Sequence, residues 1–240
     1  MVDAATEFKK SGFNDEDSAT LAGVAAMYQN VADDAISAGE SANFIISQMK
    51  AFGLEAKDAT HIVDALNAVS NTQAVSSADL ANNIGKASAA MALGNNTYEQ
   101  TLAMLTAITE INRSGAKSAR ALVSVQSRLT QVLDEQSATG KALVEIYDGL
   151  GIALKDNEGQ LRPTFDIFKD LAKIWPDLTT NQKDYIALTQ AGANQTQNFV
   201  ALMDNFKAAL TSEETALNSA GSAIQENSRY MESLNKIGVL

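Results

Sequence analysis

Residues 97–133 read TYEQTLAMLTAITEINRSGAKSARALVSVQSRLTQVL, and this stretch decides the fold class. Apolar side chains recur in it at intervals of three and four residues, which is the spacing of one face of an α-helix. The recurrence appears twice, on either side of a polar turn, in Leu102, Leu105, Ile108 and Ile111 and then in Leu122, Val125, Leu129 and Val132. We therefore expect two amphipathic helices folded into a hairpin.

The ends of these two helices carry their own signals. Thr97 and Gln100 have the spacing of a capping box, in which the threonine hydroxyl accepts a hydrogen bond from a backbone N–H and the glutamine side chain accepts one in return. The polar turn at Asn112–Gly115 ends the first helix, and Ser114 can cap the second. No residue of the hairpin suggests an active site.

Composition extends the helical prediction to the whole chain. The 240 residues are 45% hydrophobic but 6% aromatic, so alanine and serine must supply much of the packing, and two prolines leave long stretches uninterrupted. The predicted fold class is all-α: an elongated multi-helix bundle of about ten short-to-medium helices with a longer C-terminal helical region. One small β-ribbon is allowed near residues 152–162, where Asp156–Gly159 is typical of a turn.

We expect three parts along the chain. Residues 1–54 form an N-terminal helical segment that packs on the core, and residues 55–191 form a compact helical module. Residues 192–240 form a long helical region, the start of an extended or coiled-coil segment. No run of residues resembles a signal peptide or reaches the ~20 apolar residues of a membrane span, so we expect a soluble, untargeted segment cut from a longer chain.

The C-terminal region has apolar residues at every seventh position, the spacing of a coiled-coil seam. A coiled-coil seam needs a second set of apolar residues at the same spacing, and here that set is less apolar because it includes Glu213 and Asn227. Two interpretations remain open. The first is a self-associating coiled coil in which Asn227 sets the register. The second is two ordinary helices docked on the bundle, with a new helix starting at Thr211, which has capping-box spacing to Glu214. The candidate seam residues are Met203, Phe206, Leu210, Leu217, Ile224, Met231 and Leu234.

Charge limits the classes of partner. The formal net charge is −11, so a sequence-independent grip on nucleic-acid phosphates is not expected. Positive charge gathers in the hairpin, and Arg113, Lys117 and Arg120 are candidate partner-contact residues, with Arg128 nearby. They face an acidic neighbour either within the fold or on a partner protein.

The sequence offers little for metal or cofactor chemistry. It contains no cysteine and one histidine, His61, so it lacks the donor set of a transition-metal site. The acidic clusters at Asp15–Asp17 and Asp33–Asp34 are typical of solvated helix starts. We therefore predict no metal, no cofactor and no catalytic residue.

Several short phrases are more specific than helical periodicity. They comprise Ala68–Asn71 with Ser77, Asp79 and Leu80; Ala89–Ala90 and Leu93–Gly94; Tyr98–Glu99 with Leu102; Leu122 with Arg128–Leu129; Leu150–Ile152 with Asp156, Gly159 and Pro163; and Ala220–Ala223 with Met231–Leu234. In this order they resemble the core region of phage tail tape measure proteins, over roughly residues 55–240. One departure lies at Ala116–Ala121, where relatives often have an Ala-Gly-Thr-Ala-Leu phrase and this chain lacks the glycine.

The resemblance implies a non-enzymatic structural and assembly module that contributes to tail-length determination through helix-face contacts. Its implied partners are other tail components, its own copies and tail assembly chaperones, and its implied location is the virion tail, assembled in the bacterial host cytoplasm. Because glycine, asparagine and proline interrupt the helices, we expect a compact docking module attached to the ruler rather than a continuous ruler helix.

Two alternatives come from other functional classes. A non-catalytic helical binding module or filament subunit shares this composition, although no fixed-period repeat is evident. A cell-wall glycan hydrolase requires a buried acidic glutamate, whereas Glu99, Glu110 and Glu145 occupy ordinary helical positions.

Overall fold

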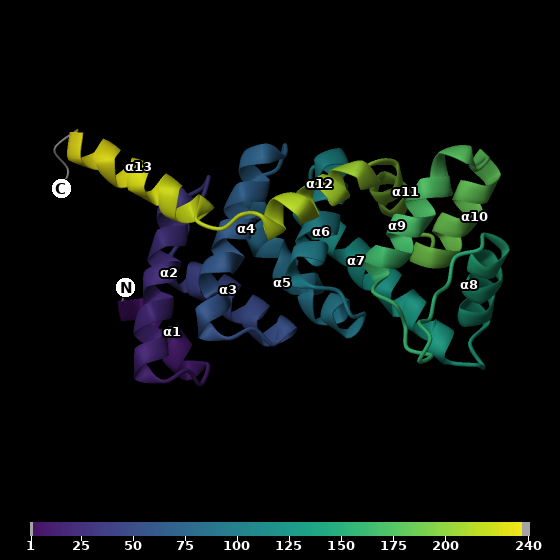
Figure 1. Cartoon of the computed structure of the whole chain (residues 1–240), viewed down its shortest axis with the longest axis horizontal. Helices are drawn as coiled ribbons and strands as arrows, with labels where there is room; N and C mark the ends of the chain where they lie inside the picture. Colours follow the sequence, from purple (N-terminus) through teal and green to yellow (C-terminus); the bar gives the residue numbers. More distant parts are fainter. Residues whose placement is uncertain (1, 237–240) are drawn as a thin grey trace. The chain divides into compact units, whose positions relative to one another are not determined.

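The computed structural model of the chain describes residues 2–236 and is all-α, as the sequence predicts (Figure 1). Within these residues there are thirteen α-helices and three short 3₁₀ helices, rather than the ten or so expected. The helices are more numerous because caps and positive-φ residues, such as Gly53 and Gly192, divide the chain into shorter pieces.

Two compact units make up the described chain. The first contains the residues up to Gly85 and those from Glu214 onward, and the second contains Lys86–Glu213. Helices α5 (Ser77–Leu93) and α12 (Phe206–Leu217) contribute to both units. These boundaries differ from the expected divisions after residues 54 and 191, because the C-terminal helix packs against helices near the N-terminus.

The first unit is built around α2 and α4. Besides parts of α5 and α12 it contains α1 (Val2–Lys10), α2 (Asp15–Val31), α3 (Ala38–Phe52), the 3₁₀ helix η1 (Ala56–Asp58), α4 (Ala59–Thr72) and α13 (Ser222–Lys236). Asn14 caps α2 by accepting a hydrogen bond from the Asp17 N–H at 2.8 Å, and Gly53 ends α3 in the left-handed conformation predicted for it. Phe8, Tyr28, Ile45 and Ile62 are among its buried side chains.

The second unit surrounds α6. Its elements are α6 (Tyr98–Asn112), α7 (Gly115–Thr130), η2 (Gln131–Leu133), α8 (Ala138–Gly149), α9 (Thr164–Ile174), η3 (Trp175–Asp177), α10 (Thr180–Ala191) and α11 (Thr196–Asp204). Helices α7, α9 and α11 pack against α6, so every residue from Thr101 to Thr109 is buried. This helix is therefore covered on all sides rather than amphipathic, and Ile111 in its last turn is 57% exposed.

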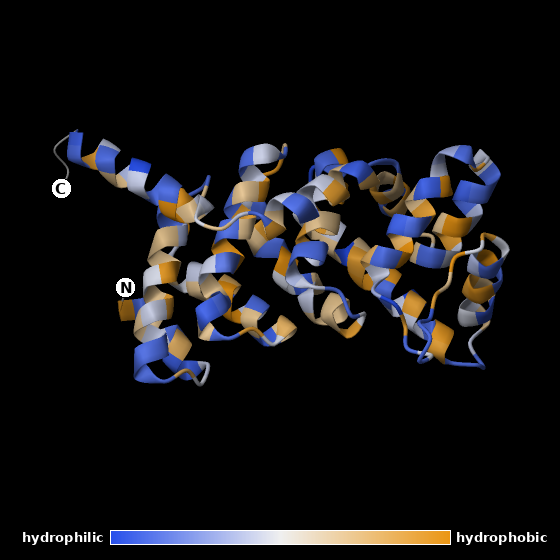
Figure 2. Cartoon of the chain, viewed as in Figure 1, coloured by the Kyte–Doolittle hydropathy of each residue, from blue (hydrophilic) through white to orange (hydrophobic). Residues whose placement is uncertain are grey.

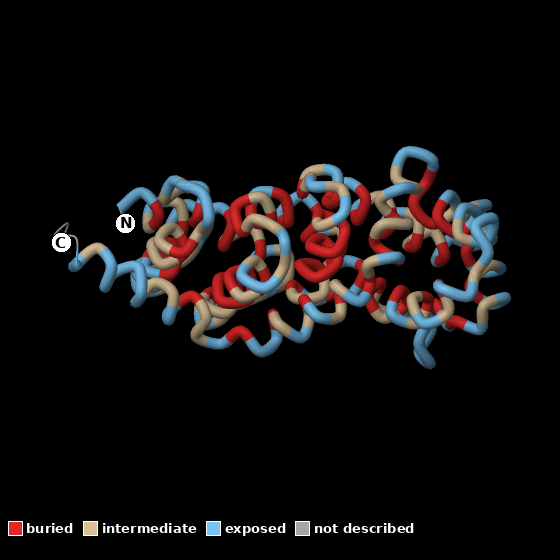
Figure 3. The backbone as a smooth tube through the Cα atoms, turned by 90° about the horizontal axis from the view of Figure 1, so that it is seen from above, coloured by how far each residue is buried: buried red, intermediate tan, exposed pale blue. Residues whose placement is uncertain are grey.

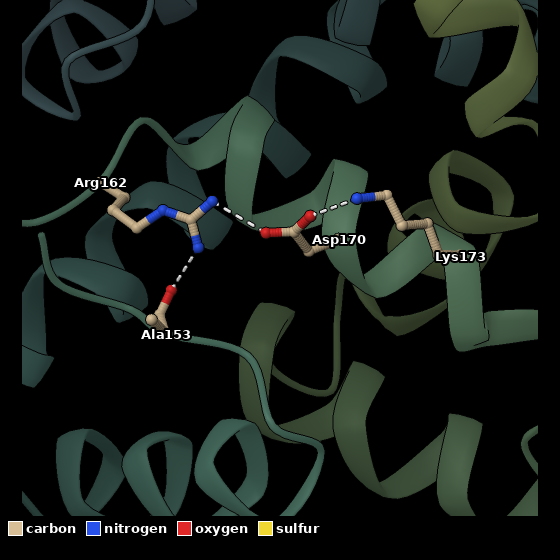
Figure 4. A network of polar contacts seen from close by, with 4 residues as sticks. All are labelled: Ala153, Arg162, Asp170 and Lys173. Atoms are coloured by element: carbon tan, nitrogen blue, oxygen red, sulfur yellow. Dashed lines mark hydrogen bonds and ion pairs between the residues drawn. The ribbon is translucent and has the colours of Figure 1, made fainter.

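A loop joins α8 to α9 in place of the expected β-ribbon. Within residues 2–236 it contributes one isolated antiparallel bridge, between Lys155 and Leu161, and no strand. Arg162 fastens the loop by donating hydrogen bonds to the Ala153 carbonyl at 2.6 Å and to Asp170 on α9 at 2.8 Å, and Asp170 also pairs with Lys173 at 2.7 Å (Figure 4).

The C-terminal region forms three helices instead of one or two. Helix α11 ends at Asp204, α12 runs through Thr211 to Leu217, and α13 begins at Ser222. The predicted restart at Thr211 is wrong, because Thr211 and Glu214 lie within one continuous helix. The break falls instead at residues 218–221, where Gly221 has a φ of 81° that other residues rarely adopt.

Candidate functional site

The α6–α7 turn positions the predicted basic residues. Thr97 and Gln100 form the predicted capping box at the start of α6, and Arg113 ends that helix with a φ of 55°. Ser114 then caps α7 by accepting a hydrogen bond from the Lys117 N–H, as the sequence predicts. The turn is fastened by Asn112, whose side-chain oxygen accepts a hydrogen bond from the Ser114 N–H at 2.8 Å.

Arg113, Lys117 and Arg120 are all exposed, and we call them the basic patch. Lys117 and Arg120 line a polar hollow of about 810 Å³ beside α7. The Arg120 Nε donates a hydrogen bond to the Ala116 carbonyl at 3.1 Å. Neither Lys117 nor Arg120 forms an ion pair with any residue between 2 and 236, so both charges are available to a partner.

Much of the remaining lining of the hollow was not foreseen from the sequence. It consists of Asp184 on α10 and the amide-rich residues 193–198. Asn112 donates to the Asn198 side chain at 2.9 Å, and Asn198 donates to Gln195 at 2.8 Å, so the amides fasten this segment to the α6–α7 turn. The run of asparagine and glutamine after Gly192 is the signal that could have identified it. Asp184 is the acidic neighbour that the fold itself places at the hollow.

Arg128 does not join the basic patch. Its Nη1 donates to the Thr189 carbonyl at 3.1 Å, in the last turn of α10, where a cation is favourable to the helix dipole. The guanidinium also lies against Gly192, where an added Cβ would come within 2.8 Å of it, and Gly192 has a φ of 76°. This part of the local positive charge therefore stabilises the fold.

The seven candidate seam residues do not lie on one helix. Met203 and Phe206 are buried in the second unit, and Leu210 is half-buried there. Leu217, at the end of α12, and Ile224 and Met231, on α13, are exposed, and Leu234 is half-buried. The register residue of the coiled-coil interpretation, Asn227, accepts a hydrogen bond from Asn30 at 2.8 Å within the chain.

A carboxylate from α4 holds the start of α13. Asp64 is 3% exposed, and its two oxygens accept hydrogen bonds from the Gly221 and Ala223 N–H groups, each at 2.8 Å. The negative charge thus meets the positive end of the α13 dipole. Asn67 donates to Ser222 at 2.9 Å and to Glu226 at 3.0 Å, which fastens the same turn.

The outer surface of α13 is open. Figure 3 shows most of this helix, which leads to the C mark, in the colour of exposed residues, and Figure 2 shows a largely hydrophilic helix with isolated apolar positions. The exposed large hydrophobic side chains of α13 include Ile224, Tyr230 and Met231. The helix is therefore fixed to the first unit by polar contacts while apolar side chains face outward.

Residues 2–236 hold no group of three His, Cys, Asp or Glu side chains arranged to bind a metal ion. Of the three glutamates considered for glycan hydrolysis, Glu145 is exposed, and Glu110 accepts a hydrogen bond from Asn205 at 3.0 Å. Among the helices of the described part of the chain, none has the length and apolar character needed to cross a membrane.

Comparison with known proteins identifies the family. Residues 1–192 match the family model described as phage-related minor tail protein. The chain is also 25% identical over 204 residues to a tape measure protein of Pneumococcus phage Dp-1, an alignment that includes 82% of this chain and 17% of that protein. The chain thus spans about a sixth of the length of this relative, and no solved structure matches it. Because the family model covers most of its length, the chain belongs to the family of phage-related minor tail proteins.

Proposed function

We propose that this chain is a structural and assembly module of a tape measure protein, and that it contributes to tail-length determination through helix-face contacts. The observation that carries the proposal is the match to the phage-related minor tail protein family, together with similarity to a tape measure protein. Its partners would be other tail components, tail assembly chaperones and its own copies, joined in the virion tail during assembly in the host cytoplasm.

The helix lengths favour a docking role over that of a ruler. The longest helices within residues 2–236 have 17 residues and so rise about 25 Å each. A ruler gains length from uninterrupted helix, whereas this chain ends its helices repeatedly at caps and turns. Segments outside this chain would therefore supply the length, and this module would connect them to partners.

We assign two surfaces to this role. Within the basic patch, Lys117 and Arg120 have no ion-pair partner in the described part of the chain and line an amide-rich hollow, which suits an acidic protein surface. The outer face of α13 presents Ile224 and Met231, which suits contact with a second copy. Of the glutamates considered for a glycan hydrolase, Glu145 is exposed and Glu110 accepts a hydrogen bond from Asn205, whereas the general acid of such an enzyme requires burial that raises its pKa.

The test of the docking role uses the parent phage. The double substitution Lys117→Glu and Arg120→Glu should lower the yield of tailed particles while the remaining tails keep their normal length. Lys141→Glu with Lys155→Glu changes the charge equally at exposed positions outside the hollow, and it should leave the yield unchanged. Electron microscopy measures both quantities, and circular dichroism of the isolated chain verifies folding.

Deletion of the second unit distinguishes a docking module from a helix that sets tail length directly. If residues 86–213 acted as extended helix, their removal would shorten tails by about 190 Å. The docking role predicts loss of tails instead. A uniform population of tails shortened by that length would contradict the docking role and would assign these residues to the ruler itself.

A further inference from the structure

A groove with an apolar floor lies in the second unit and shares no lining residue with the hollow at the basic patch. It has a volume of about 760 Å³ and is bordered by α9, η3, α11 and α12. Ala172, Met203, Phe206 and Leu210 form the floor, beside Trp175 and Pro176. Phe206 also packs on Phe165, with ring centroids 5.3 Å apart, so the floor is the outer side of the core and is rigidly held.

Lysines surround this floor. Lys169 and Lys173 come from α9, Lys183 from α10 and Lys207 from α12. The only acidic lining residue is Asp204, whose carboxylate accepts a hydrogen bond from the Trp175 Nε1 at 2.7 Å. The lining of the groove therefore holds four lysines and one carboxylate, although the chain as a whole has a net charge of −11.

The fold neutralises these lysines only in part. Lys173 pairs with Asp170, which it shares with Arg162, so the three groups together keep one positive charge (Figure 4). The Lys183 ammonium lies over the Trp175 ring, 5.4 Å from its centroid. Lys207 has no ion-pair partner among residues 2–236. Lys169 lies within electrostatic reach of the Glu213 carboxylate, which offsets part of its charge. Lys207 and the group of Lys173, Asp170 and Arg162 therefore supply most of the positive charge that remains for an external ligand.

Apolar floor and lysine rim together define the chemistry of the ligand. Apolar side chains of a partner would cover Leu210 and Ala172, and carboxylates on both sides of them would reach the ammonium groups. An amphipathic helix presents this pattern, because residues at three- and four-residue intervals form one apolar stripe with polar flanks. A β-strand would need an exposed sheet edge for its backbone, and residues 2–236 form no strand.

We propose that this lysine-rimmed groove docks an amphipathic helix of another protein, one whose apolar stripe is flanked by aspartate and glutamate. Nucleic acid is disfavoured, since the floor offers no donor to phosphate and the acidic chain would repel a polyanion at longer range. The inference goes beyond the proposed function, because the groove includes neither the basic patch nor α13.

Trp175 provides the measurement, since it is the one tryptophan of the sequence and borders the groove. The probe is a synthetic helical peptide of about 18 residues with leucines on one face and glutamates on both flanks, long enough to hold a helix. Titrated into the full chain, it should change the Trp175 emission saturably, with an affinity that falls as salt rises.

Variants assign the binding to the groove. Lys169→Glu with Lys207→Glu should weaken binding at least about tenfold, because it places like charges against the peptide. Lys141→Glu with Lys155→Glu makes the same change in net charge elsewhere and should alter affinity by less than about twofold. Leu210→Gln should also weaken binding, since it replaces an apolar part of the floor. Circular dichroism checks that each variant is folded.

Several results would overturn the proposal. These are absence of binding to the wild-type chain, equal affinity for the two double variants, and equal affinity for a peptide with glutamine in place of glutamate. Preferential binding of a duplex oligonucleotide would assign the groove to nucleic acid. Self-association of the chain that Lys169→Glu with Lys207→Glu abolishes would assign it to a second copy. Comparison of the glutamate peptide with the glutamine peptide tests the charge requirement on the wild-type protein, and this test holds even if a variant fails to fold.

Discussion

Asp170 connects two segments of the second unit through one carboxylate. Its oxygens accept hydrogen bonds from Lys173 on the same helix and from Arg162 at the end of the preceding loop. These two cations hold the pKa of the Asp170 carboxyl below its usual value of 3.8, with Lys173 the larger cause. The pair with Arg162 matters more for the fold, because Arg162 also holds the Ala153 carbonyl.

The lowered pKa fixes the pH dependence of this contribution. The carboxyl is more acidic in the folded chain than in the unfolded chain, so its stabilisation is complete above about pH 4 and is lost as pH falls through the folded value. Asp170→Asn should therefore lower the free energy of unfolding near pH 6 by up to about 1 kcal/mol, since the pair is partly exposed.

Denaturant unfolding at several pH values measures the effect. The difference in free energy between wild type and Asp170→Asn should shrink as the pH falls below about 4. Asp177→Asn serves as the control, because Asp177 is exposed and forms no ion pair with any residue between 2 and 236. A difference that stays constant down to pH 2 would show that ionisation of Asp170 is not its source.

At the scale of the helix, α13 depends on a residue from another helix. Asp64 supplies the cap that the sequence around residues 218–222 does not, because its two oxygens satisfy two of the N–H groups at the start of α13. Asp64→Asn removes the charge and replaces one acceptor with a donor. We expect it to lower the stability of the first unit by about 1–3 kcal/mol and to loosen α13.

Hydrogen exchange read by mass spectrometry localises that change. Peptides from residues 222–236 should exchange faster in Asp64→Asn, while peptides from α6 and α7 should not change. Asp177→Asn is again the control, since it removes an exposed carboxylate in the other unit. Equal protection of α13 in wild type and Asp64→Asn would show that other contacts hold the helix start.

Caps explain which helix boundaries could be predicted from sequence. Thr97 with Gln100, Ser114, Gly53 and Thr179 act on backbone groups within a few residues, so their spacing alone reveals them. Long-range caps cannot be seen in this way. Asn96 accepts a hydrogen bond from the Phe165 N–H at 2.8 Å at the start of α9, and Asp64 acts on α13 from far along the chain.

The same reason separates the features around the hollow that follow from the sequence from those that do not. The exposure of Lys117 and Arg120 follows from the helical period of α7. Residues 193–198 line the same hollow because of tertiary packing, which the sequence pattern does not reveal. Capping-box spacing at Thr211 is also compatible with a surface pair inside a continuous helix, and the helix continues. The lysines of the groove come from three helices, so no single stretch of sequence reveals their grouping.

At the scale of the whole molecule, we predict that copies of the chain associate through the exposed face of α13. Ile224 is 51% exposed and Met231 is 37% exposed, and they lie seven residues apart on one side of the helix. Of the seven candidate seam residues, Ile224 and Met231 are both exposed and both lie on α13, whereas Met203 and Phe206 are buried in the core. A copy-to-copy contact would therefore be short and depend on α13.

Sedimentation equilibrium over a range of concentrations tests this prediction. The wild-type chain should show a mass that rises with concentration, and Ile224→Asp with Met231→Asp should remain monomeric, because charges in an apolar seam oppose pairing. The control is Ser228→Asp with Ser233→Asp, which changes the net charge equally on the same helix at exposed polar positions. A wild-type mass that stays monomeric throughout would contradict self-association through α13, and an equal loss of association in both variants would assign the effect to charge rather than to the seam.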